Sequence, residues 1–362
     1  MKQSKNISEA LNIEKISEIQ EKLISWYEKN HRQLPWRETL NPYYIWISEI
    51  MLQQTRVDTV IDYYKRFIVT FPTMKDLAEA DEETVLKAWE GLGYYSRAKR
   101  IHQTAKIIVE TYQGEMPRNY EEILKLPGIG PYTAGAIASI AFHQSVPAVD
   151  GNVMRVFSRI FYIKEDITLS TAQKKMQQIG EAVVSHKNPS SFNQGLMELG
   201  ALICTPTSPK CLACPLYELC KARVLGIQET LPVKRKKLKP KEVIMEMALV
   251  YKDEKILITK RPKDKLLGDL WGLPSVEKEK SFQDGKSILL ELEETYGIKA
   301  GDIKYLLEKN HIFTHIKWKM QLYMMILIEE KTIDYPEIRW ISIDELKQLP
   351  LPTAFKKIIY FD

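Results

Sequence analysis

Hydrophobic residues recur every three to four positions along the first two thirds of the chain, which is the period of one face of an amphipathic helix. This spacing begins at Ile13, Ile16, Ile19, Leu23 and Tyr27. Asn41-Pro42 opens another helix, since asparagine suits the cap and proline the first turn, and this helix is expected to run toward Thr55. Further helices are predicted over residues 82–89, 97–112, 131–142 and 152–161.

The pattern changes toward the C-terminus. Val243–Tyr251 and Ile256–Thr259 are predicted to be strands on either side of a short turn, and residues 323–328 are predicted to be a further strand. Six of the eight positions from Lys234 to Lys241 are basic, with prolines at both ends of the run. The pattern therefore predicts a helical domain over residues 8–225, a basic linker over 226–241 and an α+β domain over 242–362.

Composition narrows the class of protein. The 362 residues are 44% hydrophobic, which is enough for two domains with a core each. The net charge of +5 permits a polyanionic partner without requiring one. The charged N-terminus lacks the apolar core of a secretory signal, and the longest apolar stretch, Ala134–Phe142, is about half of the roughly 20 residues that cross a bilayer. We therefore expect a cytoplasmic protein with no membrane partner.

All four cysteines fall in one short segment, with the spacing Cys204-x6-Cys211-x2-Cys214-x5-Cys220. Four thiolates this close in sequence can surround one cluster or one ion. The familiar zinc pattern pairs two short C-x-x-C units, and only one such unit occurs here. The six- and five-residue spacers resemble the four-iron, four-sulfur loop of the endonuclease III superfamily of DNA glycosylases. This resemblance implies an iron–sulfur cluster, with zinc and four unrelated buried cysteines as the alternatives.

A glycine-containing turn is a candidate anion site. Gly128 and Gly130 precede a helix that has Pro131 in its first turn. Glycines let backbone N–H groups approach an anion closely, and a helix N-terminus favours negative charge, so a DNA phosphate would fit there. The alternative is an ordinary turn between two helices.

Two carboxyls are candidates for catalysis. Glu49 lies in the middle of a predicted helix among mostly apolar neighbours, which would raise its pKa, although a solvated surface glutamate is the alternative. Asp150 precedes a helix whose N-terminus would keep it ionised, whether it acts in catalysis or only as a cap. A protonated acid beside an ionised one suits cleavage of an N-glycosidic bond, because the leaving base needs a proton and the sugar gains positive charge.

Six segments together resemble the MutY family of adenine DNA glycosylases, closely over residues 16–225 and more loosely beyond. They are Leu34–Arg37, the Glu49-centred SEIMLQQT, Gly91–Tyr95, the turn at 126–134, AVDGNVMRV and the cysteine loop 204–220. The resemblance implies a helix-hairpin-helix at about 120–140 and one 4Fe-4S cluster on the cysteine loop. It also implies a monomer that removes adenine opposite 8-oxoguanine or guanine in double-stranded DNA.

The functional residues of the family carry over position by position. Glu49 matches the acid at adenine N7, and Asp150, supported by Asn152, matches the group that stabilises the cationic sugar. Tyr132 stands where bifunctional relatives have a lysine that forms a Schiff base, which implies a monofunctional enzyme that leaves an abasic site. The matched contacts to adenine or DNA are Trp36, Arg37, Gln54, Thr55, Leu92, Tyr94, Gly128, Gly130 and Gln194.

The second domain resembles a Nudix fold, most clearly at Trp271–Pro274. Nudix enzymes carry Arg-Glu-x-x-Glu-Glu where residues 290–295 read LELEET, so the arginine and one metal-binding carboxylate are missing and magnesium would bind poorly. The resemblance implies a recognition domain that reads 8-oxoguanine through Phe313, Thr314 and His315, where threonine replaces the serine of the family.

Three other functions fit parts of the sequence. A Nudix nucleotide hydrolase would need the missing arginine and carboxylate. A non-catalytic DNA-binding or electron-transfer protein leaves Glu49 and Asp150 unexplained. A glycosylase for oxidised pyrimidines would match neither Tyr132 nor the second domain.

Overall fold

The computed structural model describes residues 13–235, 239–278, 284–331 and 337–360. The chain divides into two compact units, the first made of Met1–Glu79 and Arg100–Lys236 and the second of Ala80–Lys99 and Lys237–Asp362. The start of the predicted helical domain, residues 8–12, and residues 236–238 of the predicted basic linker lie outside the described residues. No described helix is long and apolar enough to cross a membrane.

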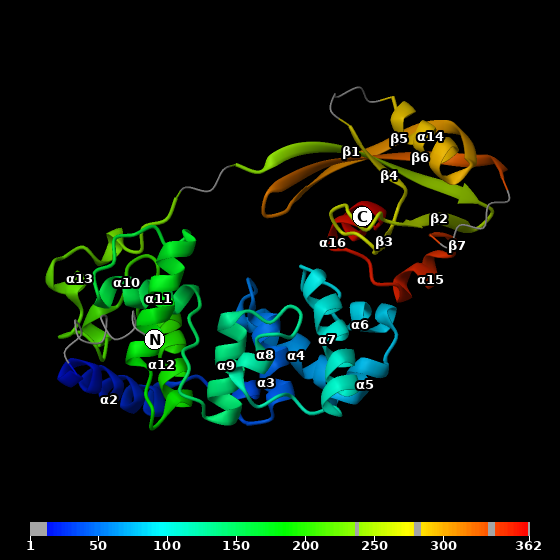
Figure 1. Ribbon diagram of the computed structural model, residues 1–362. Coiled ribbons are helices and arrows are strands. Elements are labelled where there is room, and N and C mark those ends of the chain that lie inside the picture. Colours follow the sequence, from blue (N-terminus) through cyan, green and yellow to red (C-terminus); the bar gives the residue numbers. More distant parts are fainter. Residues whose placement is uncertain (1–12, 236–238, 279–283, 332–336, 361–362) are drawn as a thin grey trace. The chain divides into compact units, whose positions relative to one another are not determined.

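The first unit is helical, as the sequence period predicts (Figure 1). Its first helix, α2 (Ile13–Asn30), buries Ile19, Leu23 and Tyr27 of the predicted apolar stripe. Three short 3-10 turns, η1 (Pro35–Arg37), η2 (Cys211–Ala213) and η3 (Gln228–Thr230), interrupt the loops. The other helices are α3 (Pro42–Leu52), α4 (Val57–Thr70), α5 (Met74–Glu79), α7 (Ser96–Tyr112), α8 (Tyr120–Ile123), α9 (Pro131–Phe142), α10 (Gly151–Ile160), α11 (Ser170–Val183), α12 (Pro189–Leu202) and α13 (Lys221–Val224).

Helix α3 ends at Leu52, earlier than the predicted end near Thr55. Asn41 caps its start by accepting a hydrogen bond from the Tyr43 N–H at 2.9 Å, as predicted. Gln53 is extended, and Gln54 has a φ of 58°, in the left-handed region that a helix cannot continue through. Gln54 and Thr55 therefore lie on a turn and not on the helix.

Helix α12 packs very closely against α10. A Cβ on Gly200 would lie 2.6 Å from the Cβ of Asn152, so only glycine fits at this crossing. Gln194 and Glu198 lie earlier on the same helix. After Leu202 the chain continues into the loop of the four cysteines. One helix thus contributes to several parts of the unit.

The second unit is built on a mixed sheet, with the strand order β3-β2-β1-β6-β5 among the described residues and with β4 beside β1 and β7 beside β2. The long strands β1 and β6 are parallel, while β5 and β6 form an antiparallel hairpin. The strands are β1 (Lys241–Lys252), β2 (Lys255–Lys260), β3 (Trp271–Gly272), β4 (Ser275–Lys278), β5 (Ile298–Ile312), β6 (Ile316–Glu330) and β7 (Ile338–Ile341).

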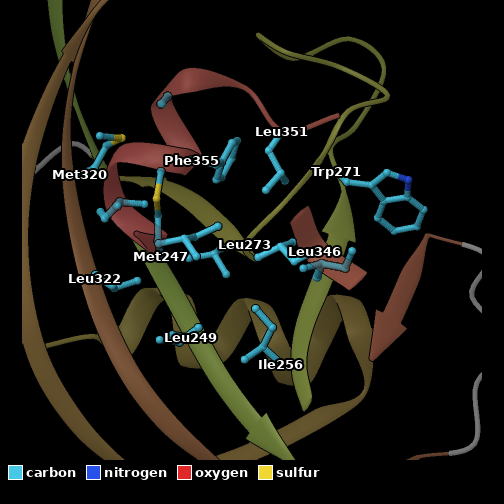
Figure 2. Close-up of a cluster of buried hydrophobic side chains, with 14 of the residues drawn as sticks. Met247, Leu249, Ile256, Trp271, Leu273, Met320, Leu322, Leu346, Leu351 and Phe355 are labelled. Atoms are coloured by element: carbon cyan, nitrogen blue, oxygen red, sulfur yellow. The ribbon is translucent and has the colours of Figure 1, made fainter. Parts of the chain in front are cut away.

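Helices cover both faces of this sheet. Alternate residues of β1, Met247 and Leu249, face a core that includes Leu346 of α15 (Ile343–Gln348) and Phe355 of α16 (Thr353–Ile359), as Figure 2 shows. Ala248 and Val250, which alternate with them, form the core on the other face with Ile288 and Leu292 of α14 (Lys286–Tyr296). A strand buried on both faces needs a continuous apolar run, which the sequence shows at 247–250; the buried Glu246 just before it is paired with Lys278 at 2.9 Å.

Residues 80–99 belong to the second unit through polar contacts. Glu83 of α6 (Glu82–Ala88) accepts a hydrogen bond from Trp271 Nε1 at 2.7 Å. Glu90 pairs with Lys356 at 2.9 Å. These contacts join a short helical segment to strands and helices more than 170 residues away in the sequence.

Candidate active site

The first unit contains a pocket of about 680 Å³, a size typical of ligand sites. It is lined by residues of η1, α3, α9, α10 and α12 and of the turn after α3. Ten residues predicted from the sequence to act at the active site or on DNA line it together: Trp36, Arg37, Glu49, Gln54, Thr55, Gly130, Tyr132, Asp150, Asn152 and Gln194. Segments separated by up to 158 residues thus meet in one cavity.

Glu49 lies at the wall of this pocket with its side chain buried, and not on a solvated surface. Burial raises the pKa of Glu49 to about 7, and the nearby charge of Asp150 adds to the rise. The hydroxyl of Tyr132 donates a short hydrogen bond to Glu49 Oε2, which opposes part of this shift. Glu49 is therefore close to half protonated near neutral pH, which is the state that a general acid needs.

Asp150 caps helix α10, and its two oxygens have different partners. Oδ1 accepts a hydrogen bond from the Val153 N–H at 2.7 Å, and Oδ2 accepts one from Asn152 Nδ2 at 2.8 Å. Burial raises the pKa of Asp150, while these two hydrogen bonds lower it. The pKa of Asp150 is therefore raised overall, in the same direction as that of Glu49, and the cap opposes only part of the effect of burial.

A third carboxyl in the pocket, Glu198, was missed by the sequence analysis. Its oxygens accept hydrogen bonds from the Arg32 backbone N–H and Nη2, both at 2.8 Å, and from Arg37 Nη2 at 2.9 Å. Burial alone would raise the pKa of Glu198, but the two guanidinium groups outweigh it and lower the pKa to about 2. Glu198 is therefore an ionised carboxylate that fixes Arg32 and Arg37 at the pocket wall.

The two glycines of the predicted hairpin have different surroundings. Gly130 is the N-cap of α9 and lines the pocket. Gly128 has a φ of 75°, and a Cβ there would lie 2.9 Å from the side chain of Arg100. Thr104 also ties α7 to this turn, by donating a hydrogen bond to the Pro127 carbonyl at 2.6 Å.

The four cysteines line a second cavity in the first unit. They form no disulfides, and Arg159 Nη1 lies 3.2 Å from Cys204 Sγ, where it can donate a hydrogen bond. Within the described part of the chain, no three His, Cys, Asp or Glu side chains converge on a site for a single metal ion. Four thiols around one cavity suit a cluster, in which the cysteines bind different irons.

Arg155 connects the cysteine loop to the active-site pocket. Its Nε donates a hydrogen bond to the Cys204 carbonyl at 2.7 Å, and its Nη2 donates one to Asn152 Oδ1 at 2.9 Å. Because Asn152 also donates to Asp150, a chain of hydrogen bonds runs from the first cysteine to this carboxyl.

The remaining predicted DNA contacts lie in the second unit. The tip of the β5–β6 hairpin carries Phe313, Thr314 and His315; Phe313 packs edge-on against Trp318, with ring centroids 4.8 Å apart, while His315 is exposed. Tyr94 is exposed and has a φ of 49°, and its hydroxyl lies 2.7 Å from Thr314 Oγ1. Leu92 is buried.

Comparisons with known protein families match three parts of the chain. Residues 47–182 match the HhH-GPD superfamily of base excision DNA repair proteins. Residues 204–220 match the iron-sulfur binding domain of endonuclease III, so the cysteine loop is a site of the iron–sulfur type. Residues 246–360 match the NUDIX domain.

Whole-chain relatives extend this result. The chain is 35% identical to the adenine DNA glycosylase of Rattus norvegicus over 96% of its own length and 78% of that protein. It is 36% identical to the adenine DNA glycosylase of Homo sapiens, covering 93% of this chain and 72% of that protein. Among solved structures, a thermostable thymine-DNA glycosylase is 31% identical and superposes with a TM-score of 0.54 over 59% of this chain and 98% of its own. The chain therefore belongs to the adenine DNA glycosylase family, a group of base excision repair enzymes.

Proposed function

We propose that this enzyme hydrolyses the N-glycosidic bond of adenine paired with 8-oxoguanine or guanine in double-stranded DNA and leaves an abasic site. The observation that carries the proposal is the pair of carboxyls in one pocket, with the pKa of Glu49 at about 7 and Asp150 held by the N-terminus of α10 and by Asn152. An adenine flipped out of the duplex would enter this pocket, and extrusion is least costly at a mispair.

The two carboxyls would act in sequence on the extruded nucleotide. Glu49 donates its proton to the adenine ring at N7, so that the base leaves as a neutral molecule. The sugar then carries positive charge, which the carboxylate of Asp150 stabilises. Glu49, now ionised, accepts a proton from the water that attacks the sugar. Trp36, Arg37 and Gln194 would bind the base.

Tyr132 supports a monofunctional reaction. Among the described residues that line the pocket there is no lysine, so no amine is available there to form a Schiff base with the sugar. Borohydride should therefore trap no covalent adduct while adenine is being released. Trapping at the rate of base release would contradict this part of the proposal.

The decisive experiment uses duplexes with adenine opposite 8-oxoguanine, guanine, cytosine or thymine. We expect release from the first two alone. Glu49→Gln should lower the rate by at least about 10²-fold, because it removes the acid but keeps the shape. Glu38→Gln, an exposed glutamate outside the pocket, is the matched control. Equal rates for wild type and Glu49→Gln would remove Glu49 from the mechanism.

Recognition of 8-oxoguanine is assigned to Phe313, Thr314 and His315, and Thr55 would lie near the oxidised guanine. Gln54 and Tyr94 would instead insert into the base stack. The threonine hydroxyl can replace that of the family serine in a hydrogen bond to the damaged base. Thr314→Ala should reduce the preference for 8-oxoguanine over guanine, while Thr314→Ser should keep it. An unchanged ratio of rates for Thr314→Ala would exclude the hairpin tip from recognition.

We further infer that Cys204, Cys211, Cys214 and Cys220 hold one 4Fe-4S cluster. A bound cluster would cross-link the loop covalently and so fix the segment that follows α12. We infer a monomer that acts in the compartment of the chromosome, the cytoplasm. Iron and sulfide analysis of the purified protein, with its mass in solution, tests both statements; a zinc-containing, colourless protein would contradict the cluster.

A further inference from the structure

Gln228 has a buried carboxamide oxygen in the wall of the cysteine cavity. It begins the turn η3, eight residues after the last cysteine, and lies outside the segment that matches the iron-sulfur family. Its side chain lines the same cavity as the four cysteines. Its Oε1 is buried and has no hydrogen-bond partner among the described residues.

A buried carbonyl without a partner is unfavourable, so the position calls for a physical explanation. If Gln228 only filled space, an apolar side chain of equal length would do so without this penalty. The neighbouring cation Arg223 offers no partner, because its guanidinium stacks 3.6 Å from the Tyr217 ring centroid and its Nε donates to the Tyr217 carbonyl.

The carboxamide of Gln228 can present either an acceptor or a donor to the cavity. A half-turn of the amide exchanges its oxygen for an NH₂ group with almost no change in shape. Sulfides and thiolates of an iron–sulfur cluster carry negative charge and accept hydrogen bonds. A bound cluster would therefore favour the orientation with the NH₂ group inward.

We propose that Gln228 donates a hydrogen bond to a sulfur of the bound cluster and thereby sets its reduction potential. This inference rests on the cluster proposed above. A hydrogen bond to sulfur stabilises the more negative, reduced form and raises the potential. Arg159 also donates to a cysteine sulfur, but it additionally holds the carbonyls of Thr205, Pro206 and Leu231, so its removal would disturb the fold. Gln228 makes no such contacts among the described residues.

The test uses the full-length protein with its cluster. Gln228→Met keeps the length of the side chain and removes the donor, and Glu229→Gln, at the exposed neighbouring position, is the control. Iron and sulfide content is measured first, and a wild-type protein without a cluster would overturn both this inference and the proposed cofactor. With equal cluster content, the potential of Gln228→Met should be lower than that of wild type and of Glu229→Gln, while adenine release is unchanged. Equal potentials would overturn the inference and leave the proposed cofactor intact.

A second measurement covers the case in which Gln228→Met loses its cluster. Wild-type protein is labelled with ¹⁵N in the glutamine side chains, and the paramagnetic state of the cluster is examined by pulsed electron paramagnetic resonance. We expect a coupled amide nitrogen and an exchangeable proton, since Gln228 is the glutamine in the described cavity wall. A spectrum without nitrogen coupling would contradict the hydrogen bond.

Discussion

Two glutamates in the same pocket are buried to a similar degree but are driven toward opposite protonation states. Glu49 is 6% exposed and Glu198 is 1% exposed. The first has a tyrosine hydroxyl as its partner and a pKa of about 7, while the second has two guanidinium groups and a pKa of about 2. Burial raises the pKa of both carboxyls, so their different partners decide whether the final pKa is high or low.

The comparison shows how one cavity can hold a proton donor beside fixed charges. Arg37 also lies near Glu49 and lowers its pKa, while the same guanidinium is paired with Glu198 at 2.9 Å. Glu198 therefore holds Arg37 in place and offers its positive charge a partner other than Glu49. Three predictions test this arrangement.

The largest effect is expected from Glu198→Gln, which leaves Arg32 and Arg37 without their counter-charge. Removing one partner of a buried ion pair should lower the free energy of unfolding by about 3 kcal/mol. The uncompensated charge of Arg37 should also lower the pKa of Glu49, so base release should decline at a lower pH than in wild type. Urea unfolding and a pH–rate profile measure the two effects.

Glu165→Gln is the control for this variant, because Glu165 pairs with Lys175 on the surface. An exposed pair contributes less than about 1 kcal/mol, so this variant should resemble wild type. If Glu198→Gln were as stable as Glu165→Gln, the pairing of Glu198 with the two arginines would contribute little to the fold.

The pH dependence of stability should show two opposite contributions, each up to about 3 kcal/mol. The raised pKa of Glu49 gives stability that is fully present below pH 4.5 and is lost as the pH rises through about 7. The lowered pKa of Glu198 gives stability that is present above pH 4.5 and is lost as the pH falls toward 2.

Unfolding measured across pH can separate these contributions. Glu49→Gln should flatten the decline between pH 4.5 and 7, and Glu198→Gln should flatten the loss between pH 4.5 and 2. Wild-type slopes in both variants would mean that other groups control the stability in these ranges.

The smallest effect is expected from Tyr132→Phe. The hydroxyl lowers the pKa of Glu49, so its removal should raise that pKa and move the decline in activity to higher pH, opposite to Glu198→Gln. The loss of one hydrogen bond should change the rate at pH 7 by no more than about tenfold. Tyr44→Phe, whose hydroxyl donates to the Pro72 carbonyl outside the pocket, is the control. A shift to lower pH would contradict the assigned role of the hydroxyl.

The two glutamates also differ in how far sequence could predict them. Glu49 has a local signal, a carboxyl among apolar helical neighbours, and the resemblance assigned it a role. Glu198 has its partners 161 and 166 residues earlier in the chain, and no local pattern links them. The available hint was its spacing of four from Gln194, which places both on one face of α12.

Most helices and strands with a regular spacing of hydrophobic residues were predicted from the sequence. The predicted helices at 82–89, 97–112, 131–142 and 152–161 are α6, α7, α9 and α10, and the strands of the 243–259 hairpin are β1 and β2. Strand β5 was not predicted, because three irregularities in its pairing with β6 interrupt the two-residue alternation. The early end of α3 depends on the left-handed backbone conformation of Gln54. Nothing about a glutamine in the sequence indicates that conformation.

The close crossing of α12 over α10 has a consequence for how this chain can vary in length. One residue inserted in α12 between Gln194 and Glu198 would turn everything after it by about 100° relative to what precedes it. Gln194 and Glu198 would then face different directions from each other, a side chain would replace Gly200 against Asn152, and the first cysteine would be displaced. We expect homologues to keep the number of residues between Gln194 and Cys204 constant.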